Sequence, residues 1–188
     1  MASVKFIVVA CLVAILGYFI HRELQMETFA FTLTKHIPAK RSDVYRKFFD
    51  EPEFWLKVHP NCVGITNIIR SQDKDGRKTV QFNLHEEVPG PFFGYPSKVH
   101  AEVPMTVKEM QENEATHMST TQFHGWLQFD QEFRFSDAKE GGMMLEERCQ
   151  YTSAKTAIRY IAPIALAQHK DIMENTRKYF MEVETKNS

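Results

Sequence analysis

The sequence predicts an α+β domain in which a curved antiparallel sheet of about six to seven strands grips a long C-terminal helix, preceded by one transmembrane helix. Three observations predict this. Period-two alternation of apolar and polar residues, typical of strands, recurs from Phe29 to Ser153. Apolar residues after Tyr160 recur every three or four positions, as on one face of a helix. An uncharged apolar run occupies Phe6 to Ile20.

The apolar run Phe6 to Ile20 is 15 residues long. A membrane-spanning helix needs roughly 20 apolar residues, and the core of a cleaved signal has about 7–15, so the length of this run is at the border between the two. The segment GYFIHRELQ at the C-terminal end of the run contains bulky residues where a signal peptidase requires small ones. An uncleaved anchor is therefore favoured over a cleaved signal. We expect residues 1–24 to form a single-pass membrane anchor, in the endoplasmic reticulum or another secretory-pathway membrane. Residues 25–188 then form one domain. The charges that flank the run slightly favour a domain on the far side from the cytosol.

The elements of the domain follow in order. Phe29 to His36 alternates as a strand that ends before Pro38. Ser42 caps a short helix, and Pro52 opens a second helical piece in its first turn. Further strands are expected at residues 63–69, 77–88, 97–110, 116–124, 126–135 and 143–153, with turns at 73–76 and 138–142. The last helix is expected at residues 164–184, with Pro163 in its first turn.

This order of elements resembles the START-like superfamily, also known as the helix-grip, SRPBCC or polyketide cyclase/dehydrase-like fold. The resemblance covers roughly Phe29 to Glu184. It is carried by the segments IPAKRSDVYRKFFDEPEFW, WLQFDQEFRF with GGMMLEERCQY, and HKDIMENTRKYFMEVE. It implies a cavity between sheet and helix for an apolar small molecule such as a lipid, sterol, isoprenoid or polyketide-like compound. The expected function is therefore a membrane-anchored binding or transfer protein, and the alternative is a cyclase, isomerase or hydrolase that uses the same cavity.

Three polar residues fall on otherwise apolar strand faces, namely Asn67, Gln131 and Glu147. Strand alternation points each of them inward, where a polar group needs a partner, a water or a ligand headgroup. We expect them to orient the polar end of an apolar ligand. The alternatives are a β-bulge that turns them to solvent, or burial with a hydrogen-bond partner from the protein itself. The expected cavity lining is Asn67, Phe82, Phe129, Gln131, Phe133, Glu147 and Tyr151.

The segment Glu87–Pro96 (EVPGPFFGYP) contains prolines and glycines that predict an irregular loop. Its Phe92, Phe93 and Tyr95 are unusually apolar for a solvated loop. We therefore expect a lid over the cavity, a membrane contact, or a loop that packs on the core of its own domain.

Other functional classes have little support. The net charge of -1 gives no basic surface for nucleic acid. No CxxC or HExxH spacing is present, so neither a metal nor another cofactor is expected. Cys62 and Cys149 are expected as separate thiols rather than a disulfide.

The eight histidines are not paired in sequence with a nucleophile, so no catalytic residue is assigned. His169 is expected at the edge of an element as a solvated or capping residue. A histidine close to Glu147 inside an open cavity would favour the enzyme. A cavity well below about 300 Å³ would favour a scaffold filled by its own side chains.

Overall fold

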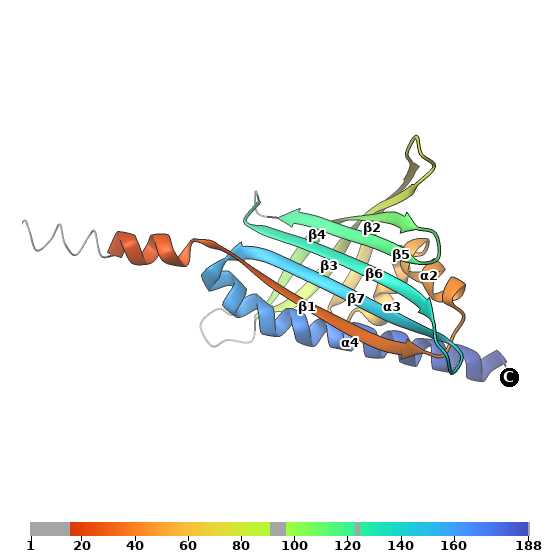
Figure 1. The fold of residues 1–188 in the computed structure, drawn as a ribbon. Helices are drawn as coiled ribbons and strands as arrows, with labels where there is room; N and C mark the ends of the chain where they lie inside the picture. Colours follow the sequence, from red (N-terminus) through yellow and green to blue (C-terminus); the bar gives the residue numbers. More distant parts are fainter. Residues whose placement is uncertain (1–15, 91–96, 123–124, 188) are drawn as a thin grey trace, which may run out of the picture.

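The computed structural model describes residues 16–90, 97–122 and 125–187, and in them a seven-stranded antiparallel sheet wraps around one long helix (Figure 1). The strand order is β1-β7-β6-β5-β4-β3-β2, so the first strand pairs with the last. The strands are β1 (Met26–Ile37), β2 (Cys62–Gln72), β3 (Lys78–Gly90), β4 (Ser97–Gln111), β5 (Ala115–Gln122), β6 (Leu127–Asp137) and β7 (Met143–Ala154). This arrangement confirms the predicted α+β class.

The long helix α4 (Lys155–Asn187) lies across the concave face of the sheet (Figure 1). Three short helical pieces follow β1 in the chain: α2 (Arg41–Phe49), η1 (Pro52–Phe54) and α3 (Trp55–Val58). The helix α3 contacts α4, and α2 contacts β6. Tyr45 on α2 donates a hydrogen bond of 2.9 Å to the buried Glu109 on β4, which fixes α2 against the sheet.

Alternation along the strands places their apolar residues on the core side. Phe129, Phe133 and Phe135 of β6 are buried, as are Leu145 and Cys149 of β7, and the residues directly next to them along each strand are more exposed. Burying each large apolar side chain stabilises the fold by about 1.5–3 kcal/mol. The predicted phases of both strands are therefore correct.

Three boundaries differ from the sequence-based expectation. Ser42 lies inside α2 and does not cap it, because the helix begins at Arg41 and Lys40 occupies the N-cap. Pro163 lies inside α4 rather than in its first turn, because the helix begins eight residues earlier at Lys155. A proline costs one intrahelical hydrogen bond, and the upstream turns are stabilised by the buried Ile158 and by Arg159 beside Glu23. Residues 87–90 are strand, since they pair with residues 97–100, although prolines and glycines predicted an irregular loop there. The proposed lid residues Phe92, Phe93 and Tyr95 lie outside the described residues.

The N-terminal helical residues 16–23 leave the domain at the start of α4 (Figure 1). Glu23 contacts Thr156 and Arg159, and the Lys155 N–H donates to the Gln25 carbonyl at 2.9 Å. Within the described part of the chain, no helix combines the length and apolar character needed to cross a bilayer. The span predicted from Phe6 to Ile20 lies mostly outside the described residues.

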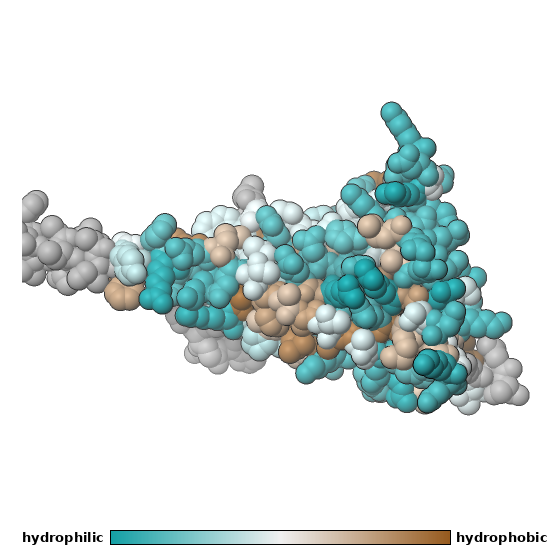
Figure 2. Space-filling model, in the orientation of Figure 1, coloured by the Kyte–Doolittle hydropathy of each residue, from teal (hydrophilic) through white to brown (hydrophobic). Residues whose placement is uncertain are grey.

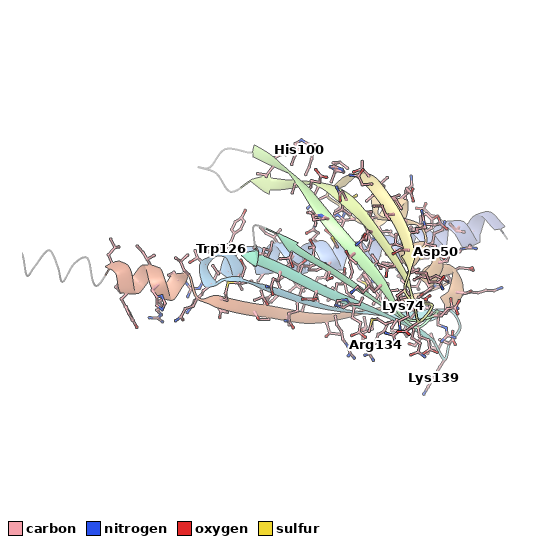
Figure 3. All side chains as sticks on the ribbon, turned by 90° about the horizontal axis from the view of Figure 1, so that it is seen from above. Asp50, Lys74, His100, Trp126, Arg134 and Lys139 are labelled. Atoms are coloured by element: carbon pink, nitrogen blue, oxygen red, sulfur yellow. The ribbon has the colours of Figure 1, made fainter. Side chains whose placement is uncertain are left out.

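The sheet divides between β4 and β5. The two strands pair only through Thr106–Gln111 and Ala115–Ser119, and beyond Ser119 the described residues of β5 pair with β6 alone. Seen from above, the two halves of the sheet diverge toward the end where Trp126 and His100 lie (Figure 3). On the outer face shown in Figure 2, hydrophilic residues cover most of the surface, with hydrophobic residues gathered in its middle. A cavity lies on the opposite, concave side of the sheet, where α4 covers it.

Candidate functional site

A cavity of about 400 Å³ lies between the sheet and α4. Its wall is mainly apolar, with Phe82 and Met105 from the sheet facing Ile161 and Ile164 from the helix. Pockets for small molecules span roughly 300–1,000 Å³, so the volume suffices for one compact ligand. The side chains of the domain therefore leave open the space that a scaffold-only protein would fill.

Four of the residues predicted to line the cavity do so: Phe82, Phe129, Gln131 and Tyr151. Phe133 and Glu147 point inward as expected but lie behind the wall. The Phe133 ring packs 4.7 Å from the Phe48 ring, measured between centroids, and Glu147 is 0% exposed beneath His169.

Asn67 does not reach the cavity, and its prediction is wrong. A β-bulge interrupts the pairing of β2 with β3 between Thr66 and Ile69, and Asn67 adopts a φ of 56° within it. The bulge shifts the alternation by one residue, so Ile68 packs against the core while Asn67 and Ile69 are exposed.

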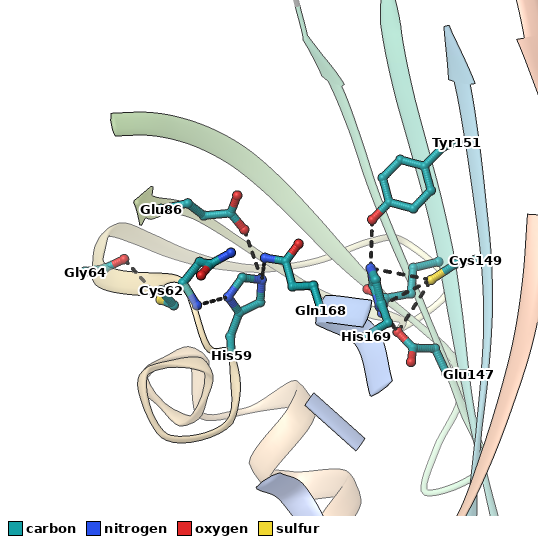
Figure 4. Close-up of polar contacts among 11 residues, drawn as sticks. His59, Cys62, Gly64, Glu86, Glu147, Cys149, Tyr151, Gln168 and His169 are labelled. Atoms are coloured by element: carbon teal, nitrogen blue, oxygen red, sulfur yellow. Dashed lines mark hydrogen bonds and ion pairs between the residues drawn. The ribbon is translucent and has the colours of Figure 1, made fainter. Parts of the chain in front are cut away.

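The most connected polar group in the cavity wall is His169 on α4, only 5% exposed (Figure 4). Its Nδ1 is hydrogen-bonded to Glu147 Oε1, and its Nε2 lies 2.7 Å from the Tyr151 hydroxyl. Gln131 also donates to Glu147 Oε1, and the Cys149 thiol lies 3.4 Å from the same oxygen. We call Gln131, Glu147, Cys149, Tyr151 and His169 the buried polar cluster. The expectation that His169 lies at an element edge in solvent is wrong.

Burial decides the protonation of two members of this cluster. It raises the pKa of Tyr151 well above its usual range, and the nearby Cys149 and Glu147 raise it further. Burial likewise raises the pKa of the Cys149 thiol, with Glu147 adding to the effect. Both side chains are therefore protonated hydrogen-bond donors at neutral pH. Glu147 Oε2 has no hydrogen-bond partner in the described part of the chain.

The ligand atoms of Glu147, Cys149 and His169 lie within 4.8 Å of one another, a donor set that suits a transition metal. The geometry is that of a hydrogen-bonded cluster, however. Two ligands of a tetrahedral zinc lie about 3.3 Å apart, and the Glu147–His169 contact is a direct hydrogen bond shorter than this. Cys62 and Cys149 are free thiols, as predicted.

A second polar group, formed by His59, Glu86 and Gln168, lines the cavity beside the buried polar cluster (Figure 4). The Asn61 N–H donates to Nδ1 of His59 at 3.3 Å, which leaves the His59 proton on Nε2, 3.0 Å from Glu86 Oε1. The Gln168 amide nitrogen lies 3.1 Å from the same Nε2.

Two buried polar atoms of lining residues have no hydrogen-bond partner among the described residues: Trp55 Nε1 and Thr120 Oγ1. The Trp55 side chain is 97% buried, since the residue is 3% exposed. An indole N–H only donates, so a ligand that satisfies it carries an acceptor such as a carbonyl or hydroxyl oxygen.

Sequence reasoning missed Glu86 and His169, although both had a signal. Glu86 continues the phase of Phe82 and Leu84 along β3, which points it inward. His169 follows Ala165 by four residues and precedes Ile172 by three, which places it on the buried face of α4.

No protein-family model matches the sequence, and no curated protein matches it either. Solved structures do share the fold. The START superfamily protein from Mycobacterium smegmatis has a TM-score of 0.57 and 15% identity, over 81% of this chain and 97% of that one. Norcoclaurine synthase from Thalictrum flavum has a TM-score of 0.57 and 10% identity, over 87% and 92%.

The di-domain ARO/CYC protein StfQ, from the steffimycin biosynthetic pathway, has a TM-score of 0.59 and 12% identity over 88% of this chain. This chain spans about half the length of StfQ, at 54%. At these identities the likeness shows the fold alone. The chain therefore has the START-like, helix-grip fold that its element order predicted.

Proposed function

We propose that this protein binds or transfers a hydrophobic small molecule in the cavity between the sheet and α4, beside a membrane. The observation that carries the proposal is the apolar cavity of about 400 Å³ in which Trp55 and Thr120 offer polar atoms without a partner. An apolar wall with a few placed polar groups is typical of small-molecule sites. Solved structures of this fold include an enzyme in complex with a transition-state analogue, which supports the use of such a fold for small molecules.

The ligand of this proposal is a lipid, sterol, isoprenoid or polyketide-like compound with an oxygen near one end. Its apolar body contacts residues such as Phe82, Phe129 and Ile164, and its oxygen accepts from Trp55 Nε1. An unpaired buried donor costs about 1–3 kcal/mol, which the ligand recovers by supplying an acceptor.

Native mass spectrometry of the detergent-solubilised full chain, followed by extraction with organic solvent, tests this proposal. We expect an apolar compound to leave with the protein. Ala165→Phe projects a ring into the cavity from α4 and lowers the amount of bound compound, whereas Ala30→Phe places the same ring on an exposed position of β1. No bound compound in the wild type, or equal amounts in both variants, contradicts the proposal.

The membrane half of the proposal rests on the apolar run Phe6 to Ile20, whose described C-terminal part exposes large apolar side chains. In the described residues, Leu16 is 61% exposed, Tyr18 63% and Phe19 54%. Large apolar groups in water favour transfer to a lipid phase. We propose an endoplasmic reticulum or other secretory-pathway membrane as the location. Alkaline carbonate extraction of microsomes is expected to leave the full chain in the pellet and to release a chain that lacks residues 1–24; release of the full chain contradicts the anchor.

A further inference from the structure

Three side chains form a continuous hydrogen-bonded path from the cavity into the core. Tyr151 lines the cavity, its hydroxyl lies 2.7 Å from His169 Nε2, and His169 Nδ1 is hydrogen-bonded to Glu147 (Figure 4). We infer that Tyr151 exchanges protons with a carbonyl compound in the cavity, that His169 takes and returns the proton of Tyr151, and that Glu147 is the positioning residue. This inference rests on the proposed function, because it requires a ligand in the cavity.

The hydrogen bonds define the direction of the path. Glu147 Oε1 accepts, so the Nδ1 of His169 carries the proton and its Nε2 presents a lone pair. The Tyr151 O–H therefore donates to Nε2, and the lone pairs of the phenol oxygen remain available to the cavity. A carboxylate that holds the imidazole in one tautomer while a hydroxyl donates to the other nitrogen is the arrangement of hydroxyl-activating triads.

Packing holds the path in this geometry before any ligand binds. The His169 ring lies between aromatic rings, 5.3 Å from Phe31 and 6.1 Å from Phe129 between centroids. The Tyr151 ring packs 4.9 Å from Phe129, and Gln131 donates to the same oxygen of Glu147. Groups that are already oriented in a dry site lower a reaction barrier without reorganising.

The proton transfer balances without a further reactant. As a C–H bond next to the ligand carbonyl breaks, its proton forms an O–H bond to the Tyr151 oxygen, and the original Tyr151 proton bonds to His169 Nε2. The electron pair stays on the ligand as an enolate, while Glu147 stabilises the imidazolium. The reverse transfer returns a proton to the same or another carbon. The reaction class is thus enolisation or double-bond isomerisation of an apolar ketone.

The raised pKa of Tyr151 is compatible with this path, because the phenol never needs to become a free phenolate. Trp55 Nε1 offers a hydrogen bond to the enolate oxygen from the same cavity. The pair His59 and Glu86 lacks this arrangement, since Nδ1 of His59 accepts from a backbone N–H, its Nε2 faces Glu86, and no hydroxyl among the described residues is hydrogen-bonded to it.

Exchange of the α-protons of 2-tetralone, a compact apolar ketone, in deuterium oxide tests the inference with the full chain in detergent. Proton NMR follows the loss of the α-proton signal, and quenching of tryptophan fluorescence gives the dissociation constant. General acid–base groups contribute about 10²–10⁴ in rate, so we expect a clear acceleration by the wild type that Tyr151→Phe lowers by about a hundredfold. The dissociation constant should stay within about threefold, which is less than 1 kcal/mol.

The matched control is Tyr179→Phe, which removes a hydroxyl from a tyrosine of α4 that packs against Phe54 and is not part of the cavity wall. Its exchange rate should equal that of the wild type. Glu147→Gln keeps the shape of the side chain but removes the negative charge that stabilises the imidazolium of His169. It should therefore lower the exchange rate about tenfold while the dissociation constant is unchanged. This split between rate and binding separates a positioning role from a merely structural one.

Three results overturn the inference. The first is no acceleration by the wild type; the fluorescence titration then shows whether binding, and with it the proposed function, also fails. The second is equal rates for Tyr151→Phe and Tyr179→Phe. The third is loss of the acceleration on adding EDTA with recovery on adding zinc, which would make Glu147, Cys149 and His169 a metal site instead.

Discussion

Replacing Glu147 by leucine should destabilise the protein substantially. Glu147 is 0% exposed, and its Oε1 accepts hydrogen bonds from Gln131 and His169. Leucine leaves both donors buried without an acceptor, at about 2 kcal/mol each. The substitution also removes Glu147 Oε2, which has no partner among the described residues, and this gain offsets about 1–2 kcal/mol. We therefore expect a net loss of about 2–3 kcal/mol in the free energy of unfolding.

Urea unfolding of the full chain in detergent, followed by circular dichroism, measures this loss by linear extrapolation. The triple variant Glu147→Leu with His169→Leu and Gln131→Met removes acceptor and donors together, so it should be more stable than the single variant. Glu140→Leu, at an exposed turn position, should change stability by less than about 0.5 kcal/mol. A loss below about 1 kcal/mol for Glu147→Leu, or a triple variant no more stable than the single one, would refute the claim that unpaired buried donors cause the loss of stability.

Two further predictions concern a glycine and a thiol. Gly142 has a φ of 72°, and an added Cβ would lie 2.5 Å from the Ile37 carbonyl oxygen; Gly142→Ala should therefore cost more than about 2 kcal/mol in urea unfolding. Gly76→Ala, at a φ of 82° but 3.6 Å from its nearest neighbour, should cost only about 1 kcal/mol, and equal losses would contradict the clash. Burial raises the pKa of Cys62 to about 11 from the usual 9.0, so the unfolded state ionises first and stability should fall as pH rises through this window. Cys62→Ser should abolish that fall in pH-dependent unfolding; an unchanged pH profile would assign the effect to other groups.

The fold was largely predictable from the sequence because strand alternation and helical periodicity are local signals. Gln131 and Glu147 were correctly placed inward by the phase of their strands. Asn67 was misplaced because a bulge changes the phase, and bulges depend on how two strands pair rather than on one strand alone. Asn is also a residue that tolerates a positive φ, which fits its place in the bulge.

The buried polar cluster was only partly predictable, for a different reason. Tyr151 and Glu147 share one strand, so their common orientation follows from the sequence. Their connection through His169 needs the docking of α4 onto the sheet, which joins residues 18 and 22 positions apart. The position of Pro163 made this harder, since it predicted a later helix start than the structure has.

The docking of α4 also determines how the two polar groups of the cavity relate to each other. Gln168 and His169 are consecutive on α4, and successive helical residues point about 100° apart. Gln168 therefore faces His59 and Glu86, while His169 faces Tyr151 and Glu147. A ligand beside α4 thus meets polar atoms on two sides of an apolar space. The Asn175 side chain donates to the Val58 carbonyl at 3.0 Å, which ties α4 to α3. Changes at this remote contact would move both polar groups together, because one rigid helix carries a residue of each.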